Sequence, residues 1–225
     1  MAIKTKELKL DIERIGMVSA ILMQPDKARA CYVLAHGAGA GMRHSFLEEI
    51  ASGLANRGIA TFRFNFPYME KNQRRPDQPM VAHATISAAV EEAARLCPGV
   101  TLVAGGKSFG GRMTSQAQSK APLPGVKALA FLGFPLHADN KPSTERAEHL
   151  ARVDVPMLFL QGTRDRLADL GTLKPVVKAL GPKAKLHEIE GGDHSFAVLR
   201  KSGRSNDEAL EEVLDALAAW IDGLG

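Results

Sequence analysis

A serine between two glycines is the first residue of this sequence whose setting suggests chemistry. Ser108 lies in the Gly-Lys-Ser-Phe-Gly run of residues 106–110, between an apolar segment and a segment of helical character. A nucleophile on a sharp strand-to-helix turn has strained backbone angles, and flanking glycines leave room for the neighbouring strand and helix. A flexible turn that ends in an ordinary N-cap serine has the same short pattern. The motif alone leaves both interpretations open.

A base and an acid for Ser108 follow later in the chain. Serine is a weak nucleophile at neutral pH and needs a base that is itself oriented by an acid. Asp165 follows an apolar strand and a turn at Gly162, and His194 follows the last predicted strand in a Gly-Gly-Asp-His loop. All three residues come just past strand ends, where α/β sheets gather their ligands. The order Ser, Asp, His is the one expected of a sheet that carries its serine on such a turn.

Other acids and histidines lack this context. Asp169 is the main alternative to Asp165, and Asp193 is expected to face solvent or to shape its turn. Three histidines away from the predicted sheet edge are expected to be structural or solvated: His83, His149 and His187.

Two backbone N–H groups would complete a site for acyl transfer, because the oxyanion of the tetrahedral intermediate needs hydrogen-bond donors. Phe109 is expected to supply one, as the residue after the nucleophile. The glycine-rich loop of residues 36–41 follows the first predicted parallel strand and is expected to supply the other, with Ala38 as the donor. Such a loop could equally bind phosphate. It supports acyl transfer only in combination with the predicted nucleophile, acid and base.

Several further residues are candidates for a substrate pocket. Lys107 is expected beside the pocket or shielding the turn. Arg112, one turn after Ser108, could bind an anionic group, although a helix-surface arginine or a structural ion pair is the more common case. Phe66 could belong to the core instead, and His137 to the surface. The full set of pocket candidates is His36, Gly37, Phe66, Tyr68, Lys107, Arg112 and His137.

Alternating apolar and amphipathic runs indicate the elements that would hold these residues: a mostly parallel sheet covered by helices. Strands are predicted at residues 7–12, 17–24, 30–35, 59–64, 100–104, 126–132, 155–161 and 185–189, the first two as an antiparallel pair. Ser45 with Glu48 and Ser205 with Glu208 are predicted to be capping boxes of two helices. Further helices are predicted at residues 81–96, 109–119 and 173–180, and a long loop at residues 65–79.

Length and composition narrow the class of protein. The 225 residues are 45% hydrophobic and 24% charged, which favours one soluble domain over residues 1–225. The net charge of +4 is scattered among acids and aromatic residues make up 5%, so no nucleic-acid partner is expected. Cys31 and Cys97 form no framework and are expected to be structural thiols in a reducing compartment. No cofactor or metal is expected, and the protein is expected to be a monomer or homodimer.

The N-terminal segment favours a cytoplasmic location. Residues 1–15 mix Lys, Glu and Asp and contain no apolar signal-peptide core. No stretch reaches the ~20 apolar residues that would span a bilayer. The expected partner is therefore a small-molecule acyl substrate and not a membrane.

Five runs of residues carry a resemblance to a known family. They are His-Gly-Ala-Gly-Ala-Gly-Met at 36–42, Arg-Phe-Asn-Phe-Pro-Tyr at 63–68, Gly-Gly-Lys-Ser-Phe-Gly-Gly-Arg at 105–112, Gly-Phe-Pro-Leu-His at 133–137 and Leu-Gln-Gly-Thr-Arg-Asp at 160–165. With these runs the chain resembles the α/β-hydrolase superfamily over its whole length. It is similar in particular to the dienelactone-hydrolase-like proteins, and especially to the KANL3/Tex30-like group.

The resemblance implies an α/β-hydrolase fold, with helices on both faces of a mostly parallel central sheet. It also implies hydrolysis of a carboxylic ester by Ser108, Asp165 and His194. Two departures limit what it implies. Dienelactone hydrolases have a cysteine nucleophile where this chain has serine, so their own activity does not carry over. The connection at residues 135–154 is too short for a large lid, which argues against a lipase.

Two other functions compete with this one. Gly-Lys-Ser after a strand is similar to a phosphate-binding P-loop, but that motif needs a glycine at position 101, where this chain has Thr101. A hydrolase fold that works only through binding is the second alternative. Loss of a triad member would favour it, and the sequence retains all three.

Overall fold

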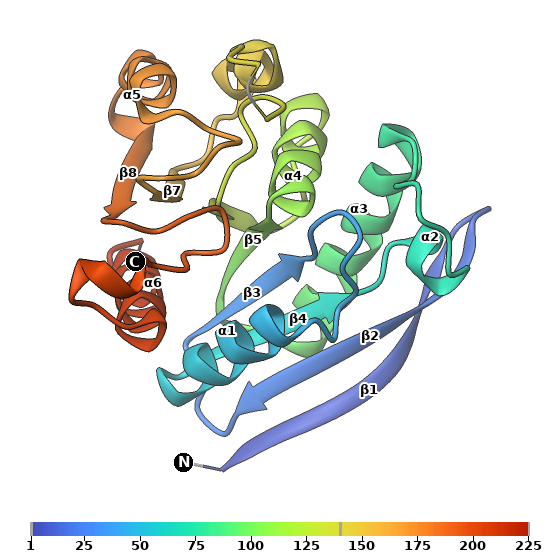
Figure 1. Ribbon diagram of the computed structural model, residues 1–225. Helices are drawn as coiled ribbons and strands as arrows, with labels where there is room; N and C mark the ends of the chain where they lie inside the picture. The colour runs from blue at the N-terminus through green and yellow to red at the C-terminus, as the bar shows by residue number, and fades with distance from the viewer. Residues whose placement is uncertain (1, 140, 225) are drawn as a thin grey trace.

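The computed structural model describes residues 2–139 and 141–224, and eight strands in it form one sheet (Figure 1). The strands are β1 (Ile3–Ile12), β2 (Gly16–Pro25), β3 (Ala30–Ala35), β4 (Ile59–Phe64), β5 (Thr101–Lys107), β6 (Val126–Leu132), β7 (Met157–Gly162) and β8 (Ala184–Ile189). Their order across the sheet is β1-β2-β4-β3-β5-β6-β7-β8. β2 is antiparallel to β1 and to β4. The remaining strands, β3 to β8, are all parallel to one another.

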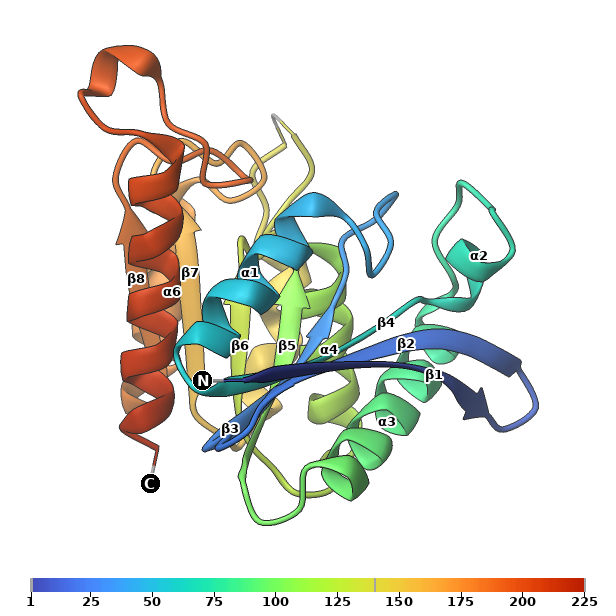
Figure 2. The ribbon, with the colours of Figure 1, turned by 90° about the horizontal axis from the view of Figure 1, so that it is seen from below.

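Helices cover both faces of this sheet. The helices are α1 (Ser45–Asn56), α2 (Pro67–Glu70), α3 (Pro79–Leu96), α4 (Phe109–Lys120), α5 (Leu170–Ala179) and α6 (Asn206–Asp222), with 3-10 turns η1 (Glu145–Arg152), η2 (Gly181–Lys183) and η3 (Arg200–Ser202). α1 and α6 pack together on one face (Figure 2), whereas α3, α4 and α5 cover the other. The predicted α/β class with helices on both faces is confirmed.

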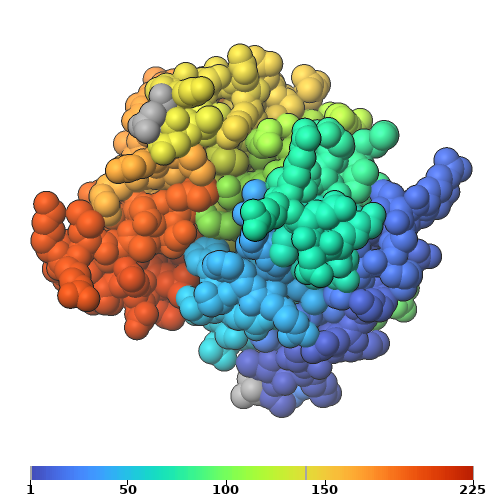
Figure 3. All heavy atoms as spheres, turned by 45° about the vertical axis from the view of Figure 1, so that its right-hand side comes forward, coloured from blue at the N-terminus to red at the C-terminus, as the bar shows by residue number. Residues whose placement is uncertain are grey.

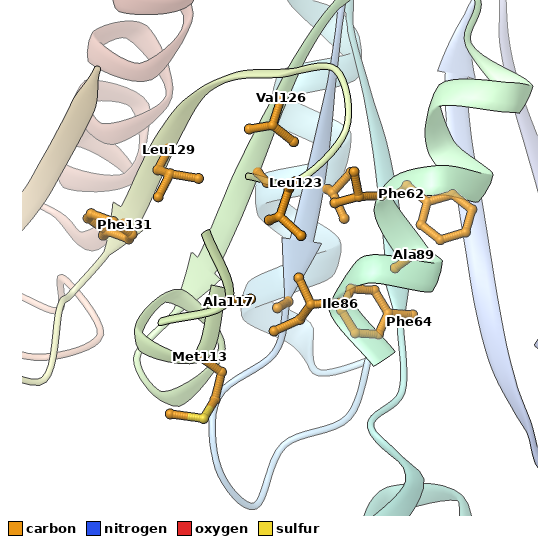
Figure 4. Close-up of a cluster of buried hydrophobic side chains, with 14 of the residues drawn as sticks. Phe62, Phe64, Ile86, Ala89, Met113, Ala117, Leu123, Val126, Leu129 and Phe131 are labelled. Atoms are coloured by element: carbon orange, nitrogen blue, oxygen red, sulfur yellow. The ribbon is translucent and has the colours of Figure 1, made fainter. Parts of the chain in front are cut away.

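Burial from both sides explains why the central strands are apolar along their whole length. Every residue of β3 and of β4 is buried. Figure 4 shows part of the core on the α3 and α4 face, where Phe62 and Phe64 of β4 lie near Ile86 of α3, and Met113 of α4 packs in the same cluster. Each such side chain contributes about 1.5–3 kcal/mol when it leaves water.

The chain changes direction at β3, and this decides where a site can form. After β3 it passes through α1 to β4 on one side, and then through α3 to β5 on the other side of β3. Loops that leave neighbouring strands in opposite directions open a crevice at the carboxyl edge of the sheet. Ala35 pairs with Gly106 across β3 and β5. The loop after β3 therefore lies directly beside Ser108.

The strand and helix predictions hold with two corrections. The strands at residues 30–35, 59–64 and 126–132 have their predicted bounds. The capping box of Ser45 and Glu48 is wrong: the N-cap of α1 is His44, whose ring accepts from the Phe46 N–H at 3.3 Å. Glu48 instead pairs with buried Arg63 at 2.8 Å, because an unpaired guanidinium inside the protein costs more than a missing cap.

The second correction concerns residues 65–79, predicted to be a loop throughout. They contain α2, a single turn that begins at Pro67, where the fixed φ of proline suits the first helical position. The other predicted capping box forms, since Ser205 and Glu208 exchange side-chain and backbone hydrogen bonds at the start of α6. Cys31 and Cys97 are buried free thiols. Within the described ranges, no helix is long and apolar enough to cross a membrane.

The contact between β3 and β5 leads to a stability prediction. Gly106 has φ +146°, and a Cβ there would overlap the Ala35 carbonyl, so Gly106→Ala is expected to abolish cooperative folding. Gly99→Ala is the matched control: φ is +78° but nothing lies within 4 Å of its Cβ, so we expect a loss of about 1 kcal/mol. Urea unfolding compares the two, and equal midpoints would contradict the steric argument.

Candidate active site

Ser108 occupies the turn between β5 and α4 in a strained conformation. Its φ is +49° and its ψ is −115°, which lies outside the regions that side-chain-bearing residues ordinarily adopt. A Cβ at Gly106 or at Gly110 would overlap the Ala35 carbonyl oxygen. The flanking glycines therefore serve the close approach of β3, and the turn is constrained rather than flexible. Strain of this kind costs of order 1–3 kcal/mol and occurs where the surrounding structure imposes it.

Asp165 and His194 form a hydrogen-bonded pair at the same edge of the sheet. His194 Nδ1 lies 2.6 Å from Asp165 Oδ2. The Asp165 side chain is fully buried, and it also accepts from the Gln161 amide and, at 2.8 Å, from the Leu167 N–H. Because the carboxylate accepts at Nδ1, the neutral ring carries its proton there and leaves Nε2 as a free acceptor. His194 is thus oriented as a base.

The alternatives to this pair have other partners. Asp169 caps α5, with its Oδ2 accepting from the Thr172 N–H at 3.1 Å. Asp193 shapes its own turn by accepting from the Ser195 and Ala197 N–H groups at 2.8 and 3.0 Å.

The three other histidines lie away from this edge, as predicted. His187 pairs with Glu212 at 2.9 Å, and the ring of His149 lies 2.7 Å from Ser115 Oγ. Burial, followed by the nearby arginines, lowers the pKa of His149 to about 4, so that ring is neutral at pH 7. His83 lies in α3, and burial is the main reason why its pKa is lowered.

A cavity of about 330 Å³ opens over Ser108 and His194. Its walls come from the loop after β3, the start of α1, and the loops after β5, β7 and β8, and its lining residues are Gly37, Ala38, Ala40, His44, Phe46, Leu47, Lys107, Ser108, Leu167, His194 and Ser195. On the face shown in Figure 3, light-blue atoms of α1 lie against orange-red atoms of the C-terminal third. Within the described residues Ser108 and His194 share the cavity without a mutual hydrogen bond, a contact that often tightens only when substrate binds.

The peptide between Gly37 and Ala38 is held in one orientation. The Gly37 carbonyl accepts from His36 Nδ1 at 2.8 Å and from the Ala40 N–H at 3.2 Å. Since N–H and C=O point in opposite directions across a trans peptide, the Ala38 N–H faces away from these donors. Ala38 also lines the cavity. Phe109 is the first residue of α4, where an N–H has no acceptor within the helix.

Buried groups behind the cavity wall hold this loop. The His36 ring is fully buried, and its Nε2 accepts from the Phe66 N–H at 3.1 Å, which joins the loops after β3 and β4. Burial lowers the pKa of His36 to about 4, so the ring stays neutral and keeps both contacts at pH 7. The hydroxyl of Tyr68 accepts from the Gly39 N–H at 3.2 Å.

The pocket candidates therefore divide into three groups. Gly37 and Lys107 line the cavity, whereas His36, Phe66 and Tyr68 support its wall from behind. Arg112 and His137 lie outside the lining. Burial, and then the charge of Arg146, lowers the pKa of Arg112. His137 holds the loop after β7, since its Nε2 accepts from the Asp169 N–H at 3.1 Å.

Two supporting residues were missed by sequence reasoning. Arg63 donates to the Met42 carbonyl at 3.0 Å, and Asn65 accepts from the Met42 N–H at 2.8 Å, so together they hold the far end of the loop after β3. The available signal was an arginine inside an otherwise apolar strand. Among the described residues, no group of three His, Cys, Asp or Glu side chains could hold a metal ion.

The fold agrees with comparisons with known proteins. The family described as alpha/beta hydrolase domain matches residues 28–222. The chain belongs to the α/β-hydrolase family. The resemblance to the α/β-hydrolase superfamily that the sequence predicts is therefore confirmed.

Solved structures share the fold at low sequence identity. A dienelactone hydrolase from Anabaena variabilis is 17% identical, with a TM-score of 0.78 and 99% of each chain covered. A serine hydrolase without a lid from Xanthomonas campestris is 19% identical, with a TM-score of 0.73 over 95% of this chain and 93% of that one. An esterase domain of a Rhodothermus marinus protein is 17% identical, with a TM-score of 0.72 over all of both chains. Between β6 and β7 the described residues of this hydrolase form only η1 and its flanking loops, without a large lid.

The two aspartates after β7 can be separated by experiment. Asp165→Asn is expected to lower kcat for a p-nitrophenyl ester by roughly 10³–10⁴-fold, because the amide no longer stabilises the charged imidazole or its tautomer. Asp169→Asn is the matched control and should leave kcat within about twofold, since it changes only the cap of α5. A larger loss in the Asp169 variant would reverse the assignment.

Support of the loop after β3 can be tested with two buried tyrosines. Tyr68→Phe removes the acceptor of the Gly39 N–H, and we expect kcat to fall roughly tenfold with KM little changed, because the Ala38 N–H loses its fixed direction. Tyr32→Phe removes a buried hydroxyl that donates to the Ala130 carbonyl at 2.8 Å within the sheet. That control should lose stability in urea but keep kcat; equal kcat in both variants would contradict the proposed support.

Proposed function

We propose that this hydrolase cleaves a small carboxylic ester or related acyl substrate through Ser108, Asp165 and His194 and an acyl-enzyme intermediate. The observation that carries the proposal is that a strained serine and a histidine paired with a buried aspartate open onto one cavity. These parts come from three loops that are far apart in the sequence. Their convergence is the arrangement that nucleophilic catalysis by serine requires.

In the proposed first step, His194 Nε2 takes the proton of the Ser108 hydroxyl as the oxygen attacks the acyl carbonyl. The imidazolium that forms is stabilised by Asp165, which remains ionised. The N–H groups of Phe109 and Ala38 donate to the oxyanion. When the tetrahedral intermediate collapses, His194 returns the proton to the leaving alcohol and the acyl group stays on Ser108.

Water completes the cycle in the second step. His194 removes a proton from a water molecule that attacks the acyl-enzyme, the oxyanion forms again at the same donors, and the proton goes back to Ser108 Oγ as the acid leaves. The position of Ser108 at the start of α4 adds a favourable dipole for the developing negative charge. The chain's own residues supply every proton transfer in this scheme.

The cavity favours a short acyl group. Its apolar walls include Phe46, Leu47 and Leu167, and its volume of about 330 Å³ lies at the low end for ligand sites. We therefore expect p-nitrophenyl acetate and butyrate to be better substrates than the octanoate. A scaffold that acts only through binding would have no need for the backbone strain at Ser108.

One experiment tests the nucleophile and the base together. The protein is treated with a fluorophosphonate probe and the adduct is mapped by mass spectrometry, and we expect the modification on Ser108. Ser108→Ala and His194→Ala are each expected to lower kcat by several orders of magnitude. The double variant should be little worse than either single one, because members of a triad act as a unit.

The matched control is Ser195→Ala, because Ser195 also lines the cavity and directly follows His194 in the sequence. It should keep both labelling and turnover. Full esterase activity in Ser108→Ala, or a folded wild-type protein that is not labelled, would overturn the proposed function and favour the binding scaffold.

A further inference from the structure

The side chain before the nucleophile is a buried lysine in an aromatic setting. Lys107 ends β5 and is 9% exposed. Its ammonium lies 5.7 Å from the ring centre of Phe46 in α1 and 5.6 Å from that of Phe196 in the loop after β8. The face of an aromatic ring attracts a cation, and the attraction is stronger when the cation is withdrawn from water. The lysine therefore contacts two elements that both contribute residues to the lining of the cavity.

The ammonium of Lys107 is directed at the residue that we assign as the base. Lys107 Nζ donates a hydrogen bond to the backbone carbonyl of His194. A Cβ placed on Gly133 would lie 2.8 Å from Lys107 Nζ and 3.3 Å from His194 Cε1, so the absence of a side chain there lets the ammonium and the imidazole approach each other. Asp165 holds the ring of His194 from one side, and Lys107 holds its main chain from the other.

This charge lacks the partner that a structural lysine would have. Within residues 2–139 and 141–224, no carboxylate lies within 4.0 Å of Lys107 Nζ. A buried ammonium without an ion pair costs folding free energy, and a methionine of similar length would fill the same space at no such cost. The cost points to a role in function.

We propose that Lys107 is a positioning residue, whose ammonium clamps the His194 main chain and keeps a fixed positive charge beside the imidazole. The inference rests on the proposed function, because it assigns the role through His194. The clamp fixes the main chain from which the His194 ring extends into the cavity that it shares with Ser108. The hydrogen bond is strong only while the amine is protonated, because an ammonium donates a charge-assisted hydrogen bond.

The charges around Lys107 define a pH range for this role. Burial lowers the pKa of Lys107 to about 8, although the negative charges of Asp165 and Asp193 raise it. The other titratable groups that face it are the imidazole of His194 and the exposed His44 across the cavity. Lys107 is therefore charged below about pH 8 and loses the charge as pH rises further.

Three variants separate the clamp from the charge. Lys107→Met keeps the length and removes both, Lys107→Arg keeps a charge that does not titrate, and Lys127→Met is the control at an exposed position of β6. We expect kcat of Lys107→Met to fall roughly tenfold or more with KM within about threefold. Its melting temperature should not fall, since the buried charge is removed. The control should match wild type in kcat and KM.

The pH dependence of kcat/KM distinguishes positioning from packing. In wild type the rate should decline above about pH 8, and in Lys107→Arg that alkaline decline should be absent. A purely structural lysine would lower activity in Lys107→Met without this difference between wild type and Lys107→Arg, and equal alkaline limbs in those two proteins would overturn the proposal.

A second measurement does not depend on turnover. Amide hydrogen exchange of residues 193–197 is expected to be at least tenfold faster in Lys107→Met than in wild type, with the strands unchanged. Equal exchange rates in wild type and Lys107→Met would show that Lys107 does not hold this loop. If wild type shows no activity that depends on Ser108, the proposed function fails while this exchange measurement still decides whether Lys107 holds the loop. If wild type is active and the Lys107 variants match it in kcat and in hydrogen exchange, this inference is wrong while the proposed function stands.

Discussion

The close approach of β3 to the turn between β5 and α4 is the constraint on which the site depends. Ala35 pairs with Gly106 in the sheet, and a Cβ at Gly106 or Gly110 would overlap the Ala35 carbonyl. Only because these side chains are absent can α4 begin so close to the sheet and hold Ser108 at φ +49°. The same approach brings the loop after β3 beside Ser108, so one backbone contact places both the serine and the Ala38 N–H.

This geometry requires several polar groups to be buried near the carboxyl edge of the sheet. His36 is neutral and joins two loops, Arg63 is paired with Glu48, and Asp165 accepts from three donors. Lys107 is the exception, since its ammonium has an aromatic surrounding and a carbonyl but no close carboxylate among the described residues. Buried polar groups with full hydrogen bonding restrict loops to one arrangement, which is what a site assembled from separate loops needs.

Predictions from sequence succeeded where local chemistry decides the outcome. The strands at residues 30–35, 59–64 and 126–132 were bounded correctly because continuous apolar runs between turn residues have one stable environment, a sheet covered on both faces. The capping box of Ser205 and Glu208 formed because, among the described residues, no ion-pair partner lies close to the Glu208 carboxylate. The box of Ser45 and Glu48 does not form, because the Glu48 carboxylate pairs with Arg63, which is distant in sequence. Local rules hold until a buried partner from elsewhere offers a larger gain.

The sequence by itself determined the fold class, and it singled out Ser108, Asp165 and His194 for the proposed site, because glycine spacing and strand ends are local features. The tertiary structure decided what surrounds them. Asp169 caps α5, and three of the pocket candidates support the cavity wall from behind: His36, Phe66 and Tyr68. The contact of Lys107 with the His194 carbonyl joins residues 87 positions apart. Such contacts depend on how loops from different strands meet, and a linear pattern of residue types does not contain that information.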